Sequence, residues 1–207
     1  MNRSRDFKID DVGQIQLLRS TVRQEIVDTV HALRECSLRE VAEYIGRPAD
    51  GLYYHANALI DGGLLVKTGE KETDRRPEAT YSTPSKGILR MRYKPQDASH
   101  SNAVSNVVTS MLKTANRDFA QGLKPKGARC TGPERNLNAS RQKAWLNKKQ
   151  LKKVNSLLAK IQDIFANMDA EQDAELHSFT FVLAPIKPSE TRRTTPSKDS
   201  ERSSNAG

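Results

Sequence analysis

Residues 15–63 carry three helical patterns in succession, each ended by a stop signal, and this limits the chain to a few small helical folds. The first pattern steps by three or four residues, as one face of an amphipathic helix does. Its apolar members are Ile15, Leu18, Val22, Ile26, Val30 and Leu33. We therefore predict one helix over residues 15–33.

The second helix is predicted from its two ends. Ser37-Leu38-Arg39-Glu40 is a capping box, in which the serine hydroxyl accepts from the amide of Glu40 and the glutamate bonds back to the amide of Ser37. Gly46 can adopt the left-handed conformation that ends a helix. The residues expected to face inward are Leu38, Val41, Ala42 and Ile45.

A third helix is predicted to start near Pro48, which suits a first helical turn, and to end at Gly62-Gly63. Its inward residues are Leu52, Ala56 and Leu59. Two short strands, Leu64–Lys67 and Ala79–Ser82, are then predicted to form a hairpin with a charged tip. Three helices followed by such a hairpin are typical of a winged helix-turn-helix.

The third helix and the strand after it also match a family pattern. Tyr54-His55, Leu59 and Gly63-Leu64-Leu65 resemble the corresponding motif of the ArsR-type winged-helix transcription regulators. The resemblance covers about residues 15–84. Ala56 replaces a usual leucine, and Asn57 and Ala58 stand where the family often has basic residues.

The resemblance implies a cytoplasmic, nucleoid-associated bacterial or archaeal regulator that binds double-stranded DNA as a homodimer, and we expect a repressor. Many relatives sense metals through a cysteine pair, but Cys36 and Cys130 are 94 positions apart. We therefore expect no metal and no cofactor, although an unidentified small-molecule effector could act. No grouping of nucleophile, base and third residue indicates an enzyme.

The expected DNA-binding residues lie on the third helix, just before it, and on the hairpin. Side chains outside the inward stripe are free to enter a major groove, where asparagine can contact adenine. They are Arg47, Asp50, Gly51, Tyr53, Tyr54 and Asn57, joined on the hairpin by Lys71, Arg75 and Arg76. Two alternatives stay open: a tyrosine ring fills the core, or the hairpin is merely solvated because its acids cancel its cations. His55 is more simply explained as a structural residue than as a ligand or base.

Charge is distributed unevenly along the 207 residues, whose net charge is +9. Between Met111 and Lys153, twelve Lys or Arg stand against two acids. A less specific nucleic-acid-binding or chromosome-organising protein that uses this second half is therefore the alternative function.

The second half is predicted to form a small α/β appendage. A helix is expected over residues 102–122, and a longer one from the cap Asn147–Gln150. The longer helix carries apolar residues on a strict three-four spacing, which is the seam that two helices bury between them. We assign this seam to dimerisation, the alternative being packing on its own domain: Leu151, Val154, Leu158, Ile161 and Phe165. Strands are expected over 142–146 and 178–184.

The predicted organisation is a flexible N-terminus (1–12), a winged helix-turn-helix DNA-binding domain (13–85), a basic linker (86–101), a dimerisation or regulatory region (102–186) and a disordered tail (187–207). The tail assignment depends on its composition, in which Ser, Thr, Arg and Lys dominate. The first residues are polar and no run of about 18 apolar residues occurs, so neither a secretory signal nor a membrane span is expected.

Overall fold

Two helices, rather than the single one predicted, carry the first apolar stripe. The structure is a computed structural model that describes residues 6–74, 76–124, 127–167 and 174–186. In it α1 (Val12–Leu17) and α2 (Thr21–Leu33) are separated by a turn at Leu18–Ser20. The side-chain amide of Gln24 donates to the carbonyl of Leu18 at 2.6 Å, so the broken helix end keeps a partner. Ile15 and Leu18 are nevertheless buried in the same core as Ile26 and Val30, which is why the stripe continues across the turn.

The next two helices form as the sequence predicts. α3 (Leu38–Ile45) has both hydrogen bonds of its capping box and ends at Gly46, whose φ is +65°. α4 (Asp50–Asp61) buries Leu52, Ala56 and Leu59. The α3–α4 pair and the hairpin after it are compatible with the predicted helix-turn-helix with a wing.

The capping box gives a stability prediction. Replacing Ser37 by alanine removes the acceptor for the Glu40 amide, so the free energy of unfolding should fall by about 1 kcal/mol. Urea denaturation followed by circular dichroism measures the change. Ser105→Ala is the control, because Ser105 is exposed on the helix predicted over residues 102–122. This variant should leave stability nearly unchanged. Equal stability of the two variants would contradict the role given to this cap.

The hairpin belongs to a three-stranded antiparallel sheet in the order β2-β4-β3. β3 (Val66–Lys71) starts later than predicted, because Leu64 and Leu65 are buried and donate their amides to the carbonyl of Leu59 at the end of α4. β4 (Glu78–Ser82) lies between β3 and the two-residue strand β2 (Cys36–Ser37), which was not predicted. The hairpin is thus fixed to the start of α3.

A second, parallel sheet joins two segments that were expected to be a flexible terminus and a linker. β1 (Phe7–Ile9) pairs with β5 (Leu89–Met91), with Phe7 opposite Leu89. Both differ from the prediction because three-residue strands carry no visible alternation and their partner lies about 80 residues away. An ion pair also joins the two segments, since Arg90 of β5 contacts Asp6, just before β1, at 2.7 Å.

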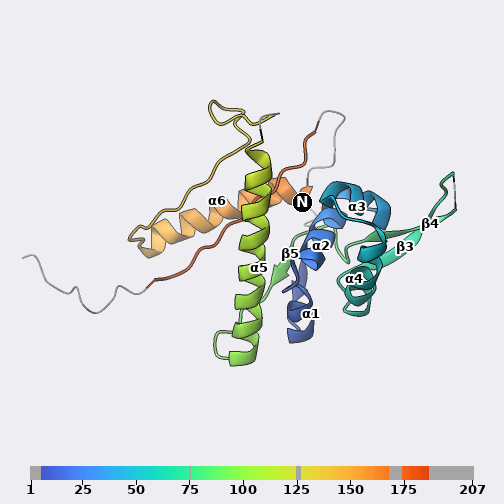
Figure 1. The fold of residues 1–207 in the computed structure, drawn as a ribbon. Helices are drawn as coiled ribbons and strands as arrows, with labels where there is room; N and C mark the ends of the chain where they lie inside the picture. Colours follow the sequence, from blue (N-terminus) through green and yellow to red (C-terminus); the bar gives the residue numbers. More distant parts are fainter. Residues whose placement is uncertain (1–5, 75, 125–126, 168–173, 187–207) are drawn as a thin grey trace, which may run out of the picture.

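The parallel pairing explains where the longest helix lies. Parallel strands end on the same side, so α1 and α5 (Ala98–Gly122) begin close together and pack against each other (Figure 1). α5 buries Ala103 and Val107 against the core, and its Val107 carbonyl accepts from Gln24 of α2 at 3.1 Å. It therefore starts four residues before the predicted 102 and belongs to the same core as α1 and α2.

The C-terminal part differs most from the prediction. α6 (Lys148–Asn167) starts at the expected cap, where Asn147 and Gln150 bond to each other's amides. It projects from the body on the side opposite the hairpin, and its C-terminal end touches the body where Arg34 donates to the Ala166 carbonyl (Figure 1). The predicted strands at 142–146 and 178–184 are wrong, since both segments are irregular. The alternating residues 178–184 have no neighbouring strand in the part of the chain that the structure describes, and Phe179 instead stacks on Phe165 of α6 at 5.6 Å. The tail from residue 187 lies outside the described residues.

Candidate nucleic-acid interface

The outward face of α4 presents the residues predicted for it. Asp50, Gly51, Tyr53, Tyr54 and Asn57 are all exposed, while the opposite face is buried. Tyr54 is 76% exposed and Tyr53 43%, so neither ring fills the core. A side chain at Gly51 would meet no atom within 4 Å, which leaves the start of the helix open to an approaching surface.

Arg47 is held by an ion pair rather than free. Its guanidinium lies 3.3 Å from the carboxylate of Glu25, whose side chain is only 3% exposed. The same carboxylate pairs with Arg117 of α5, which also contacts Asp118 at 2.9 Å. Arg47 therefore ties the turn before α4 to α2 and α5.

This network was missed by the sequence interpretation. Glu25 lies beside Ile26 on the buried side of α2, and an acid at such a position calls for a cation. That signal is present in the sequence, but nothing there identifies Arg117 as the partner.

His55 is half-buried on α4. Its ring meets the edge of Tyr54 at a centroid distance of 5.5 Å. Its partial burial, with Arg23 and Arg47 nearby, lowers its pKa below the usual value. Nδ1 has no hydrogen-bond partner among the described residues.

The cations of the hairpin are mostly paired. Lys71 contacts Glu40 of α3 at 2.8 Å, and Lys67 contacts Glu70 at 3.0 Å. Arg76 is exposed, and Arg75 lies outside the described residues. The structure therefore places Lys71 and Arg76 on the same hairpin, as predicted for DNA contacts, but Lys71 is already paired with the carboxylate of Glu40.

Glu35 connects the strands β3 and β4 through its carboxylate. The hydroxyls of Thr68 and Thr80 donate to its carboxylate at 2.7 and 3.0 Å, and these bonds hold its pKa below the usual value. The base of the hairpin is thereby tied to the end of α2, so its strands have a fixed position relative to α4.

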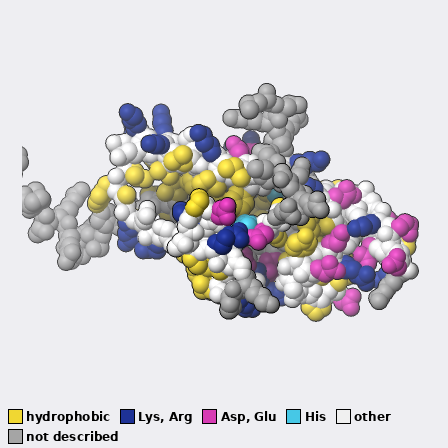
Figure 2. Space-filling model, turned by 90° about the horizontal axis from the view of Figure 1, so that it is seen from above, with side chains coloured by type: hydrophobic (Ala, Val, Ile, Leu, Met, Phe, Trp, Pro, Cys, Tyr) yellow, Lys and Arg dark blue, Asp and Glu magenta, His cyan; other side chains and the backbone are white. Residues whose placement is uncertain are grey.

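Charge is segregated between the two ends of the molecule. From Ser37 to Thr83 the chain has six Lys or Arg and eight Asp or Glu, a net formal charge of −2. Figure 2 shows acidic side chains with some Lys and Arg among them over the end that carries the hairpin, while Lys and Arg project from the end that carries α6. The α4 face thus offers hydrogen-bonding and aromatic groups with little net positive charge.

The predicted dimer seam on α6 is left largely open. Leu151 and Phe165 are 40% and 47% exposed, and Val154, Leu158 and Ile161 are half-buried. The neighbouring Leu157 and Ile164 are more exposed still. The helical core therefore leaves this apolar face open, while Phe179 of the C-terminal segment stacks on Phe165 at one end of it.

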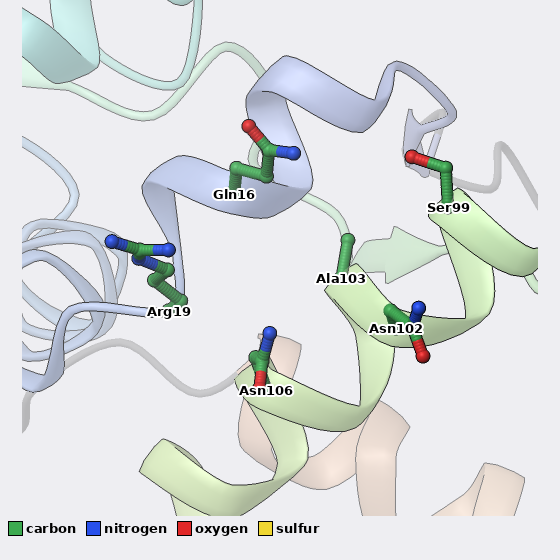
Figure 3. Close-up of a pocket in the computed structure, with 6 residues that line it drawn as sticks. All are labelled: Gln16, Arg19, Ser99, Asn102, Ala103 and Asn106. Carbon is green, nitrogen blue, oxygen red and sulfur yellow. The ribbon is translucent and has the colours of Figure 1, made fainter.

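A pocket between α1 and α5 is small and polar. Its volume is about 150 Å³, and its lining residues are Gln16, Arg19, Ser99, Asn102, Ala103 and Asn106 (Figure 3). Ligand pockets usually measure several hundred cubic ångströms and are largely apolar. This depression therefore gives no support to the effector expectation.

Two further observations concern other kinds of site. Within the ranges that the structure describes, no three His, Cys, Asp or Glu side chains converge as metal ligands would. None of the helices in those ranges is long and apolar enough to cross a membrane.

No protein-family model matches the chain, and no curated protein matches it.

Proposed function

We propose that the protein is a winged helix-turn-helix regulator that binds specific double-stranded DNA as a homodimer, most simply as a repressor. The observation that carries this proposal is the open outward face of α4 beside a fixed two-stranded hairpin. In this arrangement a helix enters the major groove and the hairpin touches the adjacent backbone or minor groove. A homodimer places two copies of α4 on two half-sites. The largely open apolar seam of α6 supports this dimer, because a second copy of the helix could cover it.

Asn57 tests the proposed contact with bases. Asn57→Ala should reduce the discrimination between the selected DNA site and random DNA by about 1–3 kcal/mol, because a bidentate contact to adenine is lost. The site is first selected from a random duplex library with the full chain, and competition titrations then compare both DNAs. Asn102→Ala, an exposed asparagine on α5, is the matched control. Equal weakening on both DNAs would refute a base contact by Asn57.

A second candidate function is favoured by the charge segregation. If the acidic end around the hairpin contacts protein, the basic second half could bind nucleic acid with little sequence preference, as in a chromosome-organising protein. The library selection separates the two functions, since the second predicts no enriched sequence.

A further inference from the structure

A continuous basic region lies between Glu134 and Asp163. Over these 28 residues the sequence has eight Lys or Arg and no acid. They are Arg135, Arg141, Lys143, Lys148, Lys149, Lys152, Lys153 and Lys160. We call residues 135–162 the basic arm. All eight side chains are exposed, and none pairs with an acid in the part of the chain that the structure describes.

The arrangement of the lysines is unfavourable for the free helix. Lys148 and Lys152, like Lys149 and Lys153, are four residues apart, so like charges face each other on one side of α6. The first turn of α6 also contains no acid, although the helix dipole favours negative charge there. Both penalties are relieved when an anion with several charges lies along this side.

The only tryptophan of the chain lies within the same region. Trp145 is 88% exposed and stands between Lys143 and Lys148, on irregular backbone just before α6. A flat indole beside several cations is the combination by which proteins hold a nucleic-acid strand, because the cations contact phosphates and the ring stacks on a base.

We propose that the basic arm binds the phosphate backbone of a nucleic acid and that Trp145 stacks against one of its bases. The inference rests on the second candidate function, the binding of nucleic acid by the basic second half, for which it names the binding residues, and it needs no residue of α4. An anionic membrane is the less favoured partner. The open apolar face of α6 is assigned to the dimer in the proposed function, and Arg135, Arg141 and Lys143 lie on irregular backbone outside this helix.

The test uses the full chain with two probes of random sequence, a 30-nucleotide single strand and the matching duplex. Because Trp145 is the only tryptophan, quenching of its emission reports binding at the arm itself. We expect quenching by nucleic acid and a steep dependence of affinity on salt. The single strand and the duplex distinguish stacking on an unpaired base from contact within a duplex.

The decisive variant replaces Lys148, Lys149, Lys152 and Lys153 by glutamine, which is also a good helix former. Affinity for both random probes should fall at least about tenfold, and the slope of log K against log salt should become shallower by about 3–4. The matched variant with four arginines should keep both. Trp145→Phe should retain most of the affinity for the single strand, and Trp145→Ala should lose it. Because both variants lack the tryptophan, their binding is measured by the anisotropy of a fluorescently labelled strand.

Two results would overturn the proposal. One is a glutamine variant that keeps the affinity and salt slope of the original protein. The other is quenching by vesicles of phosphatidylcholine and phosphatidylserine (3:1) without quenching by nucleic acid. Failure of the proposed function looks different: Asn57→Ala would leave discrimination unchanged while the arm variants still lose affinity for random DNA.

Discussion

Placing glutamate at Leu158 and Ile161 should convert the protein from a dimer to a monomer while α6 remains helical. Each buried apolar side chain contributes about 1.5–3 kcal/mol, so losing four of them across a dimer withdraws about 6 kcal/mol or more. That loss corresponds to a dissociation constant about 10⁴-fold weaker. Sedimentation equilibrium measures the association, and circular dichroism measures the helix content.

The matched control for the seam carries two glutamates on the outer side of the same helix. Ser156→Glu with Ala159→Glu adds the same charge at exposed positions away from the seam, and should remain dimeric. A folded Leu158→Glu, Ile161→Glu variant that still sediments as a dimer would exclude this seam as the interface. A monomeric original protein would do so as well.

Replacing Arg117 by methionine should lower the free energy of unfolding by about 3 kcal/mol. The Glu25 carboxylate is almost fully buried and would keep only Arg47 at 3.3 Å, and a buried charge that loses a partner is strongly destabilising. Urea denaturation of the full chain measures the loss. Asp118→Asn is the control, because its ion pair with Arg117 is partly exposed and contributes less than about 1 kcal/mol.

A double variant separates buried charge from lost packing. With Glu25→Met added to Arg117→Met, the Glu25 carboxylate is no longer present to be desolvated, so most of the stability should return. Arg47 is 40% exposed and can be solvated by water without its partner. Losses that simply add in the double variant would show that the cost comes from packing rather than from the unpaired carboxylate.

The helical elements were predictable where their signals are local. The capping box at Ser37–Glu40, the stop at Gly46 and the inward stripe of α4 each depend on residues within four or five positions of one another. The outward face of α4 could be predicted in the same way, because it consists of the positions outside the buried stripe.

Features that depend on distant pairing were missed or wrong. The turn at Leu18–Ser20 was invisible because α1 and α2 share one core, which continues the apolar spacing across the break. β1 and β5 are too short to show alternation. The alternating residues 178–184 did show it, but no strand lies beside them, and the aromatic side chains pack on α6 instead.

The candidate site shows the same division. Exposure of Asn57 could be predicted from helical periodicity, whereas for Tyr53 and Tyr54 periodicity left open whether a ring fills the core. The pairing of Arg47 with Glu25 and of Lys71 with Glu40 could not, because each joins residues that only the tertiary fold brings together. Local charge counts therefore overstated how much positive charge the hairpin and the turn before α4 can offer.

The length of α5 has a mechanical consequence. Its 25 residues span about 37 Å. Both parts of the helix are tied to the body, its start by α1 and Arg117 near its end by the buried carboxylate of Glu25. In a dimer joined through α6, α5 is therefore a rigid spacer that helps to set the separation of the two α4 helices, which must match half-sites about 34 Å apart.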